Sequence, residues 1–176
     1  MTISGRYFQL EMPTLRPENA AIYFPREGLA ECPGKCSFAF VPPIQSLCVI
    51  DDDMIYQFAV KLNIKQLALA DTVISFSNGE IAKDYLSAHK DDVLALPDVI
   101  LLDINMPVMD GWDFLEWFRE FKTQFKRPIT IFMVSSSIDW KDIEKAKSYS
   151  EVADYMSKPL TDGNFFEMVE WLKGTR

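Results

Sequence analysis

From residue 45 on, the chain alternates short apolar runs with longer amphipathic segments. Short apolar runs are typical of strands buried in a parallel sheet, and their alternation with helical segments indicates βαβ units. The sequence therefore predicts an α/β domain of five βα units. The expected strands span residues 46–50, 73–77, 99–102, 129–134 and 153–156.

Apolar residues between these runs recur at the spacing of one helix face. We interpret these stripes as faces packed on the sheet rather than as cofactor contacts, because each such helix must bury one side. Two further helices, around Tyr85 and Ala146, have weaker patterns. The full stripes are Ile55, Phe58, Ala59 and Leu62, then Phe114, Leu115, Phe118 and Phe121, then Phe165, Met168, Val169 and Leu172, with Ile81, Tyr85 and Ala88, and Ile143 and Ala146, as the weaker sets.

The first 44 residues differ from the rest. They hold six of the ten prolines, which interrupt short aromatic patches, so we expect an irregular N-terminal arm over residues 1–44 and a domain over residues 45–176. A length of 176 residues suits one domain and is short for two. No apolar run approaches the roughly 20 residues of a membrane span, and no secretory signal is evident, so a cytoplasmic protein away from membranes is expected.

The charge is unevenly distributed. Residues 1–44 carry four acidic and four basic side chains, so the excess that gives the net charge of -8 lies in the second part. Because an acidic domain is repelled by phosphate backbones, we expect no direct contact with nucleic acid. An odd cysteine count argues against a disulfide framework, and Cys32 with Cys36 lacks ligands for zinc because His89 is the only histidine.

Polar side chains gather where the expected strands end. Because the carboxyl ends of parallel strands meet at one edge of a sheet, these residues should lie near one another. Two carboxylates after the first strand and one after the third would repel, and Mg²⁺ is the cation best suited to relieve this. The acidic triplet could instead only cap the next helix. The residues are Asp51, Asp52 and Asp53, then Asp103 and Asn105, then Ser135, Ser136 and Ser137, and last Lys158.

Four segments of this edge resemble, in order, the signature regions of response-regulator receiver domains, the CheY-like domains of two-component signal transduction. They are CVIDDD, PDVILLDINMPVMDG, IFMVSSS and ADYMSKP, and the resemblance covers about residues 45–174. It implies a flavodoxin-like, doubly wound (βα)5 three-layer sandwich with a parallel five-stranded sheet in the order 2-1-3-4-5. It also makes Lys158-Pro159 a candidate cis peptide.

The same resemblance implies a role for each residue of the edge. Asp103 would be the phosphoacceptor, and Ser135 and Lys158 would bind the phosphoryl group. Ser135 and Tyr155 would form the switch. The implied Mg²⁺ ligands are Asp51, Asp52, Asp103 and the backbone carbonyl of Asn105. From the residues alone, Lys158 could also be a surface lysine, Ser135 a turn or N-cap serine, and Tyr155 an ordinary strand aromatic.

The implied function is that of a single-domain response regulator and phosphoprotein. It would take its phosphoryl group from a sensor histidine kinase or a histidine phosphotransfer protein, and would catalyse only its own phosphorylation and dephosphorylation. The output would be a change in the face formed by the fourth helix, the fifth strand and the last helix, read by an unknown downstream protein. No effector domain is expected, and both the N-terminal arm and the loop 148–152, which lacks the usual Ala-Gly pair, depart from the family pattern.

Three other functions fit parts of the sequence. A pseudo-receiver would keep the fold and act as a binding module without phosphorylation. A phosphatase of the haloacid-dehalogenase type could use Asp51-x-Asp53, but the acidic pair that should follow its lysine is missing. A flavin carrier of the flavodoxin type would need a phosphate-binding loop where this chain has three carboxylates, so the charge argues against it.

Overall fold

The computed structural model describes residues 43–137 and 139–175. Five strands form one parallel sheet in the order β2-β1-β3-β4-β5, which confirms the expected fold class and strand order. Each strand lies within three residues of its predicted bounds. The strands are β1 (Ile44–Ile50), β2 (Ala70–Phe76), β3 (Val99–Asp103), β4 (Thr130–Ser135) and β5 (Val152–Ser157). Apart from Pro43 and Ile44, the expected N-terminal arm lies outside the described residues.

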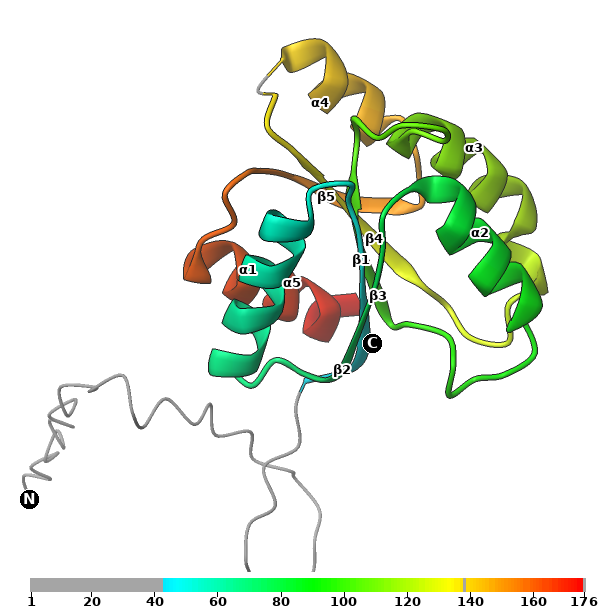
Figure 1. The fold of residues 1–176 in the computed structure, drawn as a ribbon, viewed down its shortest axis with the longest axis horizontal. Helices are drawn as coiled ribbons and strands as arrows, with labels where there is room; N and C mark the ends of the chain where they lie inside the picture. Colours follow the sequence, from blue (N-terminus) through cyan, green and yellow to red (C-terminus); the bar gives the residue numbers. More distant parts are fainter. Residues whose placement is uncertain (1–42, 138, 176) are drawn as a thin grey trace, which may run out of the picture. The chain divides into compact units, whose positions relative to one another are not determined.

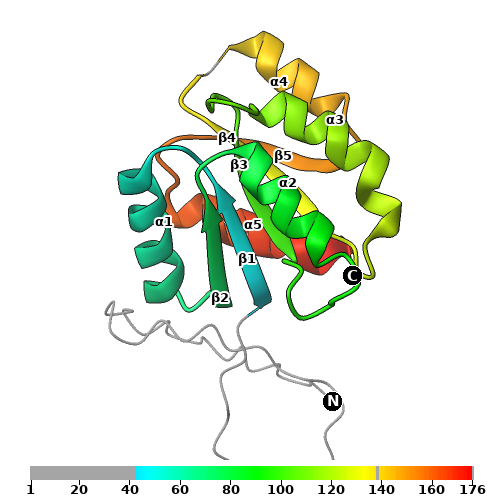
Figure 2. The same cartoon turned by 45° about the vertical axis from the view of Figure 1, so that its right-hand side comes forward.

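Helices cover both faces of the sheet and make a three-layer structure (Figures 1 and 2). One face carries α1 (Met54–Gln66) and α5 (Asp162–Thr175). The opposite face carries α2, α3 and α4, and a short 3-10 helix, η2, follows α3 directly. Their bounds are Gly79–Ala88 for α2, Gly111–Phe121 for α3, Lys122–Gln124 for η2 and Trp140–Lys147 for α4. No helix in the described ranges is long and apolar enough to span a membrane.

Alternate residues of the central strands enter two separate cores. In β1, Leu47 and Val49 pack with α1 and α5, while Cys48 and Ile50 pack with α2 and α3. This alternation is what the two-residue period of a strand requires when both faces of the sheet are covered. It explains why β1 is apolar without a break from Leu47 to Ile50 and β3 from Val99 to Leu102.

The apolar stripes of α3 and α5 face the core, as predicted. The prediction for α1 was wrong, because Ile55 and Phe58 are 82% and 69% exposed. The buried face of α1 is instead formed by Gln57, Val60 and Ile64. This helix has apolar residues on both sides, and the more apolar of its two stripes is the one that faces outward. Gln57 is tolerated inside because its amide donates to the carbonyl oxygens of Asp51 and Phe76, at 2.6 and 3.1 Å.

The two weaker helices also exist, but their core contacts are only partly those predicted. In α2 the buried residues are Gly79, Ala82 and Leu86, while Ile81 is 47% exposed and Tyr85 is half-buried. In α4 Ala146 is buried as predicted. Short helices on a twisted sheet bury only a narrow stripe. A spacing of three or four residues between apolar positions therefore does not determine which side of such a helix faces the core.

The amino ends of the strands are held together by Asp98, which precedes β3. Its carboxylate accepts hydrogen bonds from the backbone N–H groups of Gln45 and Ser46, at 2.9 and 3.0 Å, and forms a buried ion pair with Arg127. This fixes the register of β1, β3 and the start of β4. The carboxyl ends of the same strands are thereby aligned at the opposite edge, where the acidic residues lie.

Candidate functional site

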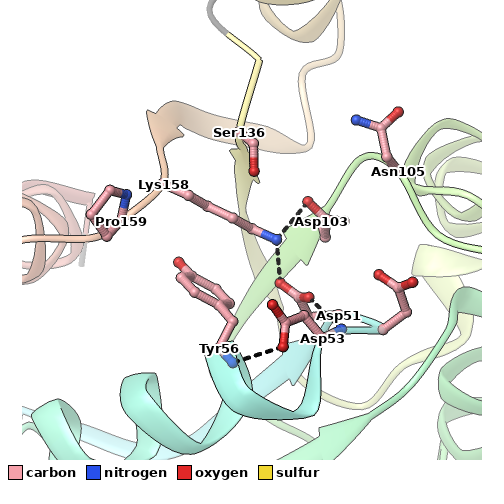
Figure 3. Close-up of a pocket in the computed structure, with 9 residues that line it drawn as sticks. Asp51, Asp53, Tyr56, Asp103, Asn105, Ser136, Lys158 and Pro159 are labelled. Carbon is pink, nitrogen blue, oxygen red and sulfur yellow. Dashed lines mark hydrogen bonds and ion pairs between the residues drawn. The ribbon is translucent and has the colours of Figure 1, made fainter.

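A pocket of about 400 Å³ opens at the carboxyl edge of the sheet, above β1 and β3 (Figure 3). The residues around it come from the loops after β1, β3, β4 and β5 and from the first turn of α1. This is the edge at which the sequence predicts a site. The lining residues are Asp51, Asp52, Asp53, Tyr56, Asp103, Asn105, Ser136, Lys158 and Pro159.

Three carboxylates converge in the pocket. Asp51 and Asp103 are buried, Asp52 is exposed, and one oxygen from each lies within 4.8 Å of the others. Three hard oxygen donors from two strand ends, one of them open to solvent, fit a divalent cation that keeps several waters. The set therefore suits Mg²⁺, and the exposed Asn105 also lines the pocket.

Lys158 forms an ion pair with each of the two buried acids. Its Nζ lies 2.6 Å from Asp51 Oδ2 and 2.9 Å from Asp103 Oδ1. Burial lowers the pKa of the ammonium, but the two carboxylates outweigh burial and hold that pKa above its ordinary value. Burial raises the pKa of Asp103, and Lys158 only partly offsets this rise. Lys158 is therefore not an ordinary surface lysine, because two buried carboxylates hold its ammonium in the pocket.

The third acid of the triplet has a different task. Asp53 is the N-cap of α1, where its Oδ1 accepts hydrogen bonds from the N–H groups of Ile55 and Tyr56, at 2.8 and 3.1 Å. Its own N–H donates to Asp51 Oδ1 at 3.0 Å. Helix capping thus accounts for Asp53. The carboxylates of Asp51 and Asp52 are the two of the triplet that group with Asp103 in the pocket.

The loop after β3 is fixed by the start of α3. Asp110 caps that helix by accepting from the N–H of Asp113 at 2.8 Å, and the N–H of Gly111 donates to the carbonyl of Ile104 at 2.9 Å. A Cβ at Gly111 would lie 2.3 Å from the carbonyl oxygen of Asp103. Glycine is therefore needed for α3 to approach the backbone of Asp103 so closely.

The hydroxyl of Ser135, the last residue of β4, is turned to its own loop, so its binding of a phosphoryl group stays a prediction. Ser135 is fully buried and its Oγ accepts from the N–H of Ser137 at 3.1 Å, so Ser136, rather than Ser135, lines the pocket. Tyr155 is half-buried, and its hydroxyl donates to the carbonyl of Ser137 at 2.6 Å. Ser135 and Tyr155, the predicted switch residues, are thus both hydrogen-bonded to Ser137 in the loop after β4. Their role in signalling stays a prediction.

Two features bring the loop after β5 to the pocket. The Lys158-Pro159 peptide is cis, as the resemblance implied. The N–H of Lys158 donates to the carbonyl of Ser135 at 2.8 Å, which ties the loop to the end of β4.

Sequence reasoning missed Tyr56. Its ring forms one wall of the pocket, and Lys158 Nζ lies 4.4 Å from the ring centroid (Figure 3). The available signal was an aromatic residue in the first turn of the helix that begins at the acidic triplet. Because the predicted core face of α1 was built on Ile55 and Phe58, Tyr56 was not considered as a residue of the site.

Comparison with known proteins agrees with this geometry. The family model described as response regulator receiver domain matches residues 47–170. A probable methanogenesis regulatory protein, FilR2, of Methanothrix harundinacea is 25% identical over 127 residues, which are 72% of this chain and 80% of that protein. A probable C4-dicarboxylate response regulator, DctR, of Halalkalibacterium halodurans is 29% identical over 122 residues, 68% of this chain but only 47% of that protein.

Solved structures give the same result. A two-component response regulator from Cytophaga hutchinsonii is 30% identical with a TM-score of 0.65, over 72% of this chain and 97% of that one. A response regulator receiver protein from Dyadobacter fermentans is 28% identical with a TM-score of 0.64, over 73% and 98% of the two chains.

Proposed function

Because this chain belongs to the response regulator receiver domain family, we propose that Asp103 accepts a phosphoryl group from a histidine kinase or a histidine phosphotransfer protein. The observation that carries the proposal is the buried Asp103 carboxylate, held 2.9 Å from the Lys158 ammonium beside two further acids. Phosphoryl transfer depends mainly on positioning and on neutralising the phosphoryl oxygens, and it needs little covalent chemistry from the protein. This pocket provides both.

In the transfer step, an Asp103 oxygen forms a bond to phosphorus while the bond between phosphorus and the donor imidazole nitrogen breaks. The electron pair of that bond stays with the nitrogen. After transfer, the Lys158 ammonium would bind one phosphoryl oxygen while it keeps its ion pair with Asp51. Asp51, Asp52, Asp103 and the backbone carbonyl of Asn105 would hold Mg²⁺, which when bound neutralises charge on the phosphoryl oxygens.

The protein surface beside the pocket suits a protein donor. Met54, Ile55 and Phe58 on α1 are 77%, 82% and 69% exposed, and the helix begins immediately after the acidic loop. An apolar surface that is continuous with a reaction site is typical of protein contact sites. A phosphodonor that covers it with its own apolar residues would bring its histidine to the mouth of the pocket.

The output is proposed to lie on the face formed by α4, β5 and α5. Ser135 ends β4 with its hydroxyl turned to its own loop, and Tyr155 on β5 is hydrogen-bonded to the same loop. Phosphorylation would draw the Ser135 hydroxyl toward the phosphoryl group, and the loop and Tyr155 would follow. This biases a two-state equilibrium that a downstream protein reads.

Acetyl phosphate and Mg²⁺ provide the direct test. The full-length protein should gain one acid-labile phosphoryl group, detected by intact-protein mass spectrometry or by a phosphate-affinity gel. Asp103→Asn should gain none, because the amide has no carboxylate oxygen to form the acyl phosphate. Asp92→Asn, an exposed acid away from the pocket, is the matched control. If the wild type gains no phosphoryl group, the chain would be a pseudo-receiver that acts only as a binding module. A gain that survives in Asp103→Asn would show that Asp103 is not the acceptor.

A further inference from the structure

Tyr56 lies on the α1 side of the pocket, next to the residues that would handle the phosphoryl group. Lys158 Nζ lies 4.4 Å from its ring centroid, and the same ammonium contacts Asp51 and Asp103 at 2.6 and 2.9 Å. The lysine is thus held by two carboxylates and by an aromatic face. A cation over an aromatic ring is attracted to the ring, and more strongly where water is excluded.

The ring of Tyr56 is fixed from several directions. Its backbone N–H is bound to the capping carboxylate of Asp53, and the side chain packs against the core cluster between the sheet and α1 and α5. With Pro159 it lines the wall of the pocket along the Lys158 side chain. The ring therefore limits where the ammonium can move.

The hydroxyl of Tyr56 points toward Pro159 and away from Asp103 (Figure 3). It is buried, and no acceptor among the described residues meets it in good hydrogen-bond geometry. Burial, together with the charges of Asp51 and Asp103, raises the pKa of the phenol; the nearby backbone of Leu160 only partly offsets this rise, so the phenol stays neutral at ordinary pH. A buried hydroxyl without a well-formed hydrogen bond contributes little to folding. The ring is thus the part of Tyr56 that acts on the site.

We infer that Tyr56 is a positioning residue for phosphoryl transfer, whose ring keeps the Lys158 ammonium at Asp103 and at the incoming phosphoryl group. The inference rests on the proposed function, since it assigns Tyr56 a task in that reaction. With acetyl phosphate, an Asp103 oxygen bonds to phosphorus while the bond from phosphorus to the acetate oxygen breaks and acetate leaves. Charge builds on the phosphoryl oxygens in this step, and a displaced ammonium would stabilise it less.

Two substitutions separate the ring from the hydroxyl. Tyr56→Phe keeps the ring and should accept phosphoryl from acetyl phosphate at nearly the wild-type rate. Tyr56→Leu keeps an apolar side chain in the core but removes the ring, and should react roughly two- to thirty-fold more slowly, the range that such a contact allows. Thermal unfolding of both variants checks that each is folded at the assay temperature.

A double-mutant cycle shows whether Tyr56 acts through the lysine. In the Lys158→Met background, Tyr56→Leu should change the residual rate by less than about twofold, because the ammonium that the ring positions is gone. A merely structural role would slow the reaction in both backgrounds, and this result would overturn the inference.

A spectroscopic measurement on the unphosphorylated protein tests the contact without any reaction. The ε-methylene protons of Lys158 should show a ring-current shift in the wild type and in Tyr56→Phe, and should lose it in Tyr56→Leu. A wild type that takes no phosphoryl group on Asp103 would contradict the proposed function. A wild type that reacts normally, with Tyr56→Leu equally fast or with the lysine resonance unmoved, would contradict only the role of Tyr56.

Discussion

Gly111 brings α3 into close contact with the backbone of Asp103, the proposed phosphoacceptor. The first residue of α3 lies against the backbone of Asp103, and a Cβ there would come within 2.3 Å of the Asp103 carbonyl oxygen and 2.9 Å of the Cα of Ile104. Both neighbours are backbone atoms, which cannot turn aside as a flexible side chain could. The glycine of the MDG sequence therefore serves packing, and through packing it sets the place of Asp103.

Gly111→Ala should lower the free energy of unfolding by about 1–3 kcal/mol, the usual cost of forcing an extra carbon into a packed site. Urea unfolding followed by circular dichroism measures this. Gly174→Ala in α5 is the matched control, since a Cβ there meets nothing within 4 Å. It should leave stability unchanged or raise it by up to about 1 kcal/mol. Equal stability of the two variants would contradict the packing described here.

At the scale of the element, α1 has two apolar sides with different tasks. Val60 and Ile64 are buried against the sheet, and Phe58 is 69% exposed on the side that begins at the pocket. A helix on the surface of a domain ordinarily has a polar outer face, so an apolar one indicates that something binds it. The helix thus contributes both to the core and to the proposed donor contact.

Phe58→Ser and Val60→Ala should therefore behave in opposite ways. Val60→Ala removes buried carbons and should cost on the order of 1–3 kcal/mol of unfolding free energy. Phe58→Ser should change stability by less than about 0.5 kcal/mol, as exposed substitutions usually do. Thermal and urea unfolding provide both values.

The phosphorylation assay adds a second comparison for Phe58→Ser. Its reaction with acetyl phosphate should match that of the wild type, because a small donor needs no protein surface. Transfer from a phosphorylated histidine kinase or phosphotransfer protein that serves the wild type should slow. If both donors work as well as before, the apolar face of α1 is not the donor contact.

At the scale of the whole molecule, the loop after β4 connects the proposed reaction site at one edge of the sheet to the surface made by α4, β5 and α5. Ser135 Oγ and the Tyr155 hydroxyl both bond to Ser137, on the loop that leads from β4 to α4. A pull on this loop from the phosphoryl group would act on α4 and β5 together. The strand at the far edge, β2, is bonded instead to the loop after β1, through the carbonyl of Phe76.

Binding of beryllofluoride, a phosphoryl mimic, should consequently change amide hydrogen exchange in α4, β5 and α5 and leave β2 as it was. Exchange read by mass spectrometry in the presence of Mg²⁺ measures this. Asp103→Asn should show no change, because it cannot hold the mimic. Unaltered exchange across α4, β5 and α5 in the wild type would show that the output surface lies elsewhere.

The sequence alone determined the sheet and the location of the site. The apolar runs predicted all five strands, and the signal is strongest for β1, β3 and β4, because a strand buried on both faces is apolar over most of its length. Asp51, Asp52, Asp103 and Lys158 were placed at one edge because the carboxyl ends of parallel strands always share an edge. The match to four signature segments supplied their expected roles.

The tertiary structure alone decided which side of each helix enters the core and how the side chains meet in the pocket. In α1 the predicted stripe is the more apolar of the two, since the buried face includes Gln57. The packing of the helix on the sheet, which buries Val60 and exposes Phe58, therefore could not be predicted from periodicity. Lys158 contacts Asp51 and the ring of Tyr56, residues about a hundred positions away in the chain. Periodicity carries no information about such contacts, because packing of the whole domain sets them.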